Sequence, residues 1–167
     1  MWQPKTAIAD EKKLLGNLLG FFRTNQKDAL AWANGGVALK EFVELHNSAT
    51  GRVDTVFPVL MIAATRLKTD FDDGDILEAA WQIEIELAVA DSKADLATEK
   101  THKYAAAVES MLANILSRDL CAGFSQLQKS YLETIVSEFD VLRKRSANEF
   151  LQIAVLSAEF SLKTSAY

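Results

Sequence analysis

The chain has 167 residues, of which 49% are hydrophobic and 25% are charged, a composition typical of soluble globular proteins. Its 23 acidic and 18 basic side chains give a net charge of −5, which provides no bulk attraction to nucleic acid or to an anionic membrane. We therefore expect no sequence-specific nucleic-acid binding and no membrane association. A chain of this length can bury a sizeable core without disulfides or metals.

Segments that would direct the chain to a membrane are not expected either. No uncharged apolar stretch reaches the roughly 18 residues that a membrane-spanning helix needs. Residues 1–5 lack the charged-then-apolar order of a secretory signal. Cys121 is the only cysteine, so an intrachain disulfide is impossible, and we interpret it as a small buried apolar side chain.

The N-terminal part of the sequence is typical of helices. Apolar residues at helical spacing predict a helix from Thr6 to about Arg23. Asn25 can cap a second, short helix that runs through Ala33, and the Asn-Gly-Gly sequence at 34–36 then predicts a stop.

The next part of the chain is more consistent with strands. The apolar residues of 37–45 fit an alternating strand, which we favour, although some of them also fit a helix. Residues 46–51 have the composition of a turn. The nearly continuous apolar run from Val56 to Thr65 predicts a buried strand, with Pro58 at its start or at an unpaired position.

The most regular pattern in the chain lies between Trp81 and Val89. Apolar and polar residues alternate there over five consecutive repeats, which predicts an antiparallel strand with one apolar face. The acidic segment Asp70–Asp75 precedes it, and Asp-Gly sequences favour the positive backbone angles of a hairpin turn. The two predicted strands therefore form a long hairpin.

The C-terminal half predicts one helix and two further strands. Ser92 and Asp95 have the spacing of a capping box and open an amphipathic helix that runs to about Arg118. Residues 131–142 and 150–162 are rich in strand formers, and the polar segment 143–149 between them predicts a second hairpin.

These elements predict the α+β fold class. We expect a largely antiparallel sheet of four to five strands, with one long amphipathic helix on one face and an N-terminal helical segment. Since no linker or repeat interrupts the sequence, residues 1–167 are predicted to form a single domain. Within it, residues 1–36 are the helical segment and residues 37–162 are the sheet-plus-helix core.

Motifs for catalysis, phosphate binding or metal binding do not occur, so we predict no enzyme activity, no cofactor and no catalytic or metal site. His46 and His102 are interpreted as structural or surface residues, and Cys121 has no neighbouring group that would activate it. Glu84 and Glu86 share one face of a strand, which the alternation alone explains, although paired carboxylates remain an alternative.

Two charged segments are candidate interfaces. Asp70, Asp72, Asp73 and Asp75 lie in the first predicted hairpin turn, and Arg143, Lys144 and Arg145 lie in the second. The acidic segment does not have the spacing of a calcium-binding EF-hand loop. Both segments can be solvated turns, but complementary tips on identical subunits also suit a closed ring.

Four segments together resemble a known family. They are the apolar stretch Val56–Ile62 with its central proline, the acidic turn Asp72–Asp75, the alternating strand Trp81–Val89 and the helix that contains Tyr104–Glu109. Their order, with a closing pair of strands, resembles the tail terminator (tail completion) proteins of long-tailed bacteriophages. The resemblance covers roughly residues 37–162.

The resemblance implies a structural virion protein of the phage neck, assembled in the host cytoplasm. Such proteins form a homo-oligomeric ring, commonly a hexamer, that caps the tail tube and joins it to the head connector or an adaptor, while DNA passes through the lumen. A different neck or tail adaptor protein and a small non-catalytic protein-binding module are the alternatives.

Overall fold

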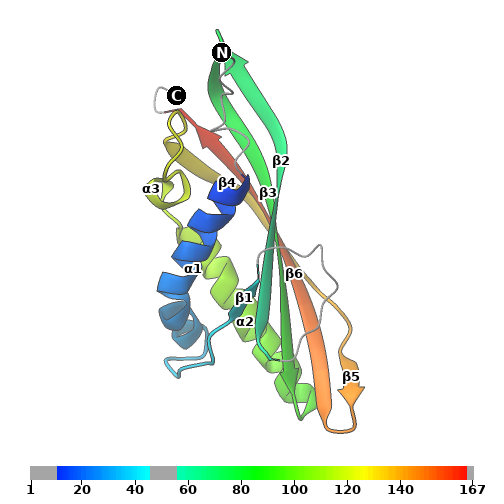
Figure 1. Cartoon of the computed structure of the whole chain (residues 1–167). Helices are drawn as coiled ribbons and strands as arrows, with labels where there is room; N and C mark the ends of the chain where they lie inside the picture. The colour runs from blue at the N-terminus through cyan, green and yellow to red at the C-terminus, as the bar shows by residue number, and fades with distance from the viewer. Residues whose placement is uncertain (1–10, 46–55, 165–167) are drawn as a thin grey trace.

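A computed structural model describes residues 11–45 and 56–164 of the chain (Figure 1). The helices and strands of this part are α1 Glu11–Ala33, β1 Val43–Leu45, β2 Val59–Asp72, β3 Asp75–Asp91, α2 Ala94–Asn114, α3 Ser117–Leu120, β4 Lys129–Phe139, β5 Arg143–Ser146 and β6 Glu149–Lys163. Within these residues, no helix combines the length and the apolar character needed to cross a bilayer.

The strands form one sheet in the order β1-β2-β3-β6-β4, and β5 also pairs with β6. All pairs are antiparallel except β1 with β2, which are parallel. Helices α1 and α2 both lie on one side of this sheet, and no helix of residues 11–45 and 56–164 lies on the other side (Figure 1). The predicted α+β fold class with a largely antiparallel sheet is confirmed, and the two shortest strands, β1 and β5, bring the described strands to six.

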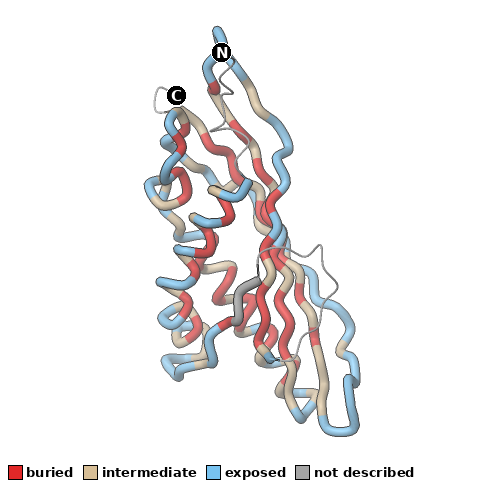
Figure 2. The backbone as a smooth tube through the Cα atoms, in the orientation of Figure 1, coloured by how far each residue is buried: buried red, intermediate tan, exposed pale blue. Residues whose placement is uncertain are grey.

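The core lies between the helices and the sheet (Figure 2). The buried, helix-facing side chains of β3 are Ile76, Ala79, Trp81, Ile83, Ile85, Leu87 and Val89. The buried stripe of α1 consists of Leu14, Leu15, Leu18, Leu19, Phe22, Gln26 and Leu30. Alternation on the strand and three-to-four spacing on the helix therefore each place one apolar face against the other.

Helix α1 is continuous, so the predicted break before Asn25 is wrong. The Asn25 side chain does not cap a new helix, since its Nδ2 donates to Phe21 O at 2.8 Å within the same helix. The buried stripe runs on through Gln26 and Leu30, and this packing outweighs the local capping preference of asparagine. The predicted stop is confirmed, because Gly35 and Gly36 have positive φ angles of 65° and 91°. The expected helix start at Thr6 lies outside the described residues.

The segment after α1 forms a strand only at Val43–Leu45, so the longer strand predicted for residues 37–45 is largely wrong. The backbone of residues 37–42 is bound by side chains rather than by a neighbouring strand. Tyr104 Oη donates to Lys40 O at 2.8 Å, and Phe42 N donates to Gln26 Oε1 at 2.9 Å. These bonds satisfy the polar groups of an irregular segment that packs against both helices. The predicted turn at 46–51 lies outside the described residues.

The long hairpin is confirmed and extends further than predicted. Strands β2 and β3 pair from Val59–Ala88 to Asp72–Asp75, and Pro58 directly precedes the first paired residue of β2, as expected for a residue without an N–H.

Both outer strands carry a bulge at the same level of the sheet. Leu67 in β2 and Glu133 in β4 have no direct partner, and both lie beside the paired residues Trp81 and Phe160. Because a bulge increases the local right-handed twist, we attribute to this pair of bulges part of the strong twist that the sheet has about halfway along its length (Figure 1).

The capping box predicted for α2 is not present. The N-cap residue is Lys93, which makes no side-chain capping bond, and the helix ends at Asn114 rather than Arg118. Asp91, the last residue of β3, takes over this role. Its Oδ1 accepts from Lys93 N at 3.2 Å and from Ser92 Oγ at 3.3 Å.

The predicted second hairpin is formed by β5 and β6, with a turn at residues 147–148. The basic residues thus lie in a short strand rather than in the loop itself. Strand β4 ends at Phe139, and β5 continues along the same side of β6 after a short break.

Candidate interface surfaces

The acidic turn is an exposed two-residue connection at one end of the sheet. Asp73 and Gly74 both have positive φ angles, 46° and 83°, which is the geometry that an Asp-Gly hairpin turn adopts. Asp72 and Asp75 flank the turn as the last pair of the hairpin. Residues 72–75 are exposed, whereas the fourth candidate carboxylate, Asp70, is half-buried.

Side-chain bonds hold the base of this turn in place. Gln126, from the segment before β4, accepts from Ile76 N at 3.2 Å through Oε1 and donates to Asp75 Oδ1 at 3.1 Å through Nε2. Lys68 forms an ion pair with Asp70 at 2.6 Å, and this contact raises the pKa of the lysine. Asp72 and Asp73 form no ion pair with any residue of the described part of the chain, so they carry the charge available to a partner.

The basic cluster is exposed along β5, and two of its three residues are already paired. Arg143 contacts Asp140 at 2.9 Å, and Arg145 contacts Glu149 at 3.1 Å. Lys144 is exposed and forms no ion pair with any residue of 11–45 or 56–164. Local carboxylates therefore neutralise much of the charge that the sequence pattern places here.

The two charged clusters lie at opposite ends of the molecule (Figure 1). Asp75 begins β3 and Asp91 ends it, while Lys144 pairs with Phe150, which in turn pairs with Asp91. The 17 residues of β3 span about 50 Å at the usual rise of a strand. The acidic and basic clusters of one chain do not meet.

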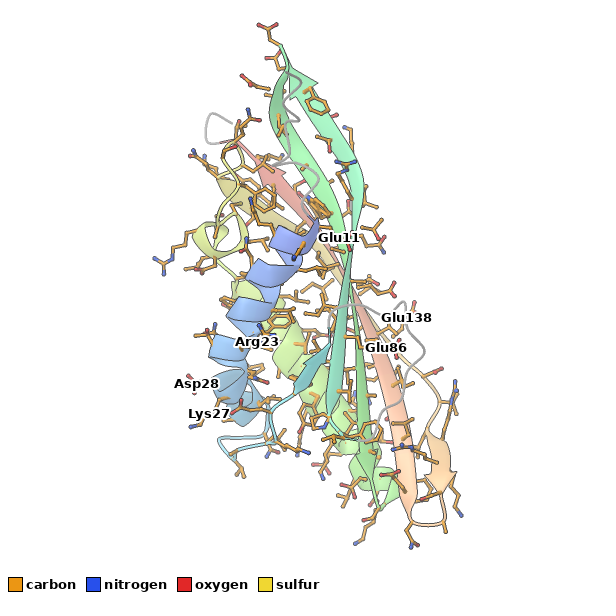
Figure 3. The ribbon with its side chains drawn as sticks, in the orientation of Figure 1. Glu11, Arg23, Lys27, Asp28, Glu86 and Glu138 are labelled. Carbon is orange, nitrogen blue, oxygen red and sulfur yellow. The ribbon has the colours of Figure 1, made fainter. Side chains whose placement is uncertain are left out.

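The sheet face that no described helix covers has glutamates in its middle part and lysines nearer the acidic turn. Glu86 of β3 and Glu138 of β4 both pair with Val155 of β6, so the three residues form one row on this face. Both glutamates point to the side away from the helices (Figure 3). Glu84 and Glu159 lie in neighbouring rows of the same face. We call this surface the open face.

In the described part of the chain, the residues considered for catalysis lie at exposed positions, against another side chain or in the core. Glu84, with Glu86, belongs to the open face, and Glu84 is exposed. The ring of His102 stacks on Phe139 at 4.1 Å between centroids, and His46 lies outside the described residues. Cys121 is buried, and burial raises the pKa of its thiol to about 11. Within the described ranges, no group of three or more His, Cys, Asp and Glu side chains could hold a metal ion.

The structure also has two open strand edges that the sequence analysis did not identify. Among the described strands, β4 is the last of the sheet, and β2 is covered by β1 only at its first three residues. A groove of about 600 Å³ runs beside β4 and includes Trp32, which is 65% exposed. The sequence does show apolar residues near the end of β4, such as Val136 and Val141. Only the strand order shows that they lie along an edge of the sheet.

Comparisons with known proteins assign no family. No protein-family model matches the chain, and no curated protein matches it. Among solved structures, the chain is similar to a chain of the virion of a native gene transfer agent (GTA) particle. The two are 15% identical, the alignment covers 84% of this chain and 91% of that chain, and the TM-score is 0.42. Similarity at this level does not assign a function to the chain.

Proposed function

We propose that this chain is a structural virion protein of a phage neck, which forms a ring that terminates the tail tube and joins the tail to the head connector. The resemblance to tail terminator proteins supports this proposal. Its four segments fall on the start of β2, on the β2–β3 turn, on β3 and on α2. These form one continuous unit, a long hairpin followed by the helix that packs on it.

The observation that carries the proposal is the separation of the two charged clusters along the sheet. In a ring of copies that stand side by side in the same direction, every acidic turn faces one pole and every β5 strand faces the other. A joining protein needs two distinct end surfaces, one for the tail tube protein and one for the connector or adaptor protein. Charged, exposed tips provide specificity for such contacts without any reaction chemistry.

The open face suits the lumen of this ring. Glu84, Glu86, Glu138 and Glu159 give its middle part negative charge. DNA that passes such a surface is repelled rather than bound, because protein binding to DNA depends on neutralising phosphates with Lys and Arg. In this proposal the chain has no catalytic role and no cofactor, and it resides in the virion.

Light scattering after size exclusion, together with negative-stain images of the full chain, tests the proposal. We expect a mass near six times the 18.4 kDa of one copy and ring-shaped particles. Reversal of charge at Asp72 and Asp73 should leave the ring intact and abolish its binding to one end partner. A chain that stays monomeric at all accessible concentrations would contradict the ring.

The groove beside β4 favours a second candidate function, a small protein-binding module. Its exposed Trp32 is the kind of aromatic anchor that protein interfaces use. Such a module would remain a monomer or dimer while Trp32→Ala abolishes binding to a host protein. If the chain forms the neck ring and the Trp32→Ala variant still forms it, the protein-binding module is excluded.

A further inference from the structure

In the part of the chain that the structure describes, the outer edge of β4 has no partner strand along most of its length. Ser117 closes the first outward-facing position, where its Oγ lies 2.9 Å from Ser130 N and 3.3 Å from Ser130 O. Beyond Ser130, no described strand pairs with this edge, since β4 is the terminal strand of the sheet. An open strand edge presents a row of backbone donors and acceptors that another strand can bind.

Apolar side chains accompany this edge on both sides. Val136 is 53% exposed on the open face, and Val141, just beyond the strand, is 79% exposed. On the helix side, Ile135 and Ser137 line the groove that contains Trp32. A strand added to β4 would cover these apolar groups as well as the backbone.

Strand β2 has the matching open edge on the other side of the sheet. Strand β1 covers it only at residues 59–61, so Ile62–Asp72 has no neighbour on that side within the described chain. Leu67 and Phe71 on this segment are 48% and 56% exposed.

We propose that the open edge of β2 in one copy pairs with the open edge of β4 in a second copy, in antiparallel orientation. Strands β2 and β4 of one chain run in opposite directions, because three antiparallel pairings connect them. Copies that stand side by side in the same direction therefore bring β2 and β4 together with the antiparallel polarity of the rest of the sheet. This inference rests on the proposed ring and specifies the contact that builds it.

The charges of the two edges are complementary. When copies stand at the same level, the rows of the sheet place Glu133 of β4 next to the row of Arg66 in the neighbour's β2, and Lys129 in the row of its Asp70. Among the described residues, neither Glu133 nor Arg66 forms an ion pair. Pairing of β4 with β4 of a second copy offers Glu133 no such cation and, in the register that sets it opposite Glu138, places like charges together, which is unfavourable across two strands. The charges thus favour a head-to-tail contact, which closes into a ring, over a symmetric dimer.

A proline substitution at Ser137 tests the contact without disturbing the sheet. Asp140 N donates to Ile153 O at 2.9 Å, so the alternation of an antiparallel ladder directs the N–H of Ser137 away from β6. Proline is tolerated at such positions of edge strands. We expect Ser137→Pro to raise the concentration needed for assembly at least about tenfold, through the lost hydrogen bond and the added ring.

Ser137→Ala is the matched control. It removes the bond from Ser137 Oγ to Glu109 just as the proline variant does, but it keeps the backbone N–H. We expect it to assemble like the unchanged chain. Circular dichroism and thermal melting establish that both variants are folded.

Zero-length carbodiimide cross-linking of the unchanged chain is an independent test. Within one copy, three strand spacings, about 14 Å, separate β2 from β4, so a direct amide between Lys68 and Glu133 must join two copies. A mixture of ¹⁴N- and ¹⁵N-labelled chains identifies such links by mass spectrometry. We expect mixed-isotope peptides that connect β2 with β4.

The outcomes separate this inference from the proposed function. A ring that forms equally with Ser137→Pro and yields no β2–β4 link overturns the edge pairing and leaves the neck ring standing. A chain that never assembles overturns both. Loss of assembly in Ser137→Pro alone, together with the mixed-isotope link, supports the edge pairing.

Discussion

The carboxylate of Asp91 joins the end of β3 to the start of α2. It forms an ion pair with Lys100 and accepts hydrogen bonds from Ser92 and Lys93. The contact with Lys100 holds the pKa of Asp91 below its ordinary value of 3.8, although burial opposes this shift. Since the pKa is lower in the folded chain, these interactions stabilise it above the unfolded pKa, and the stabilisation is lost as pH falls through the folded pKa.

Asp91→Asn should therefore destabilise the chain at neutral pH by about 1 kcal/mol, because charge-assisted hydrogen bonds are lost. The difference from the unchanged chain should shrink as pH falls below 3.8, where the native carboxylate takes up its proton. Urea unfolding at a series of pH values measures this, with Glu84→Gln on the open face as control. A constant difference at all pH values would contradict the assignment.

The hydroxyl of Tyr104 ties α2 to the irregular segment before β1. It is buried, which raises its pKa to about 12, and it donates to Lys40 O at 2.8 Å. Tyr104→Phe keeps the packing against Phe42, whose ring centroid lies 5.0 Å away, but leaves the carbonyl unbound. We expect a loss of about 1 kcal/mol in chemical denaturation. Tyr131→Phe, at an exposed position, should change stability by much less, and equal effects would refute the account.

At the scale of elements, two glycines weaken α1 without serving a close contact. A Cβ added at Gly16 or Gly20 would meet no atom within 4 Å. Alanine at each position should stabilise the chain by up to about 1 kcal/mol, since it lowers the conformational entropy of the unfolded state and favours the helix.

Gly35 provides the contrast for this prediction. It also has free space around it, but its φ of 65° is one that alanine adopts only with strain. Gly35→Ala should therefore destabilise the chain while Gly16→Ala stabilises it, as thermal melting can show. A stabilising Gly35→Ala would mean that the end of α1 is described wrongly.

The sequence predicts elements well where local chemistry and burial agree. Strand β3 follows from alternation because one face of it packs on helices, and the β2–β3 turn follows from Asp-Gly because both residues adopt positive φ. Prediction fails at Asn25 and at the start of α2. At Asn25 the capping pattern competes with the packing of α1 against distant parts of the chain. At the start of α2 the competing bonds of Asp91 are local, but they form because β3 ends at Asp91, which the capping pattern does not reveal.

For the candidate interfaces, too, the sequence predicts some features and not others. The sequence identifies the acidic turn and the basic segment by composition. Their placement at opposite ends, and the open edges of β2 and β4, depend on the strand order β2-β3-β6-β4. That order depends on the pairing of β3 with β6, which joins residues as far apart in sequence as Glu78 and Lys163 and which no local pattern encodes.

At the scale of the whole molecule, the chain is a long twisted sheet with helices on one face, an open face with glutamates in its middle part and a differently charged tip at each end (Figures 1 and 3). Each feature has a place in a ring of copies that stand side by side. In the ring that we propose, the open edges would join neighbouring copies, the open face would line the lumen, and the tips would meet the partners above and below.

A three-dimensional reconstruction of the assembled full-length chain by electron cryomicroscopy tests this arrangement most directly. We predict a closed ring in which β2 of each copy continues the sheet of its neighbour at β4, with all acidic turns at one pole. A symmetric dimer, or a ring held together by its helices with both strand edges exposed, would contradict it.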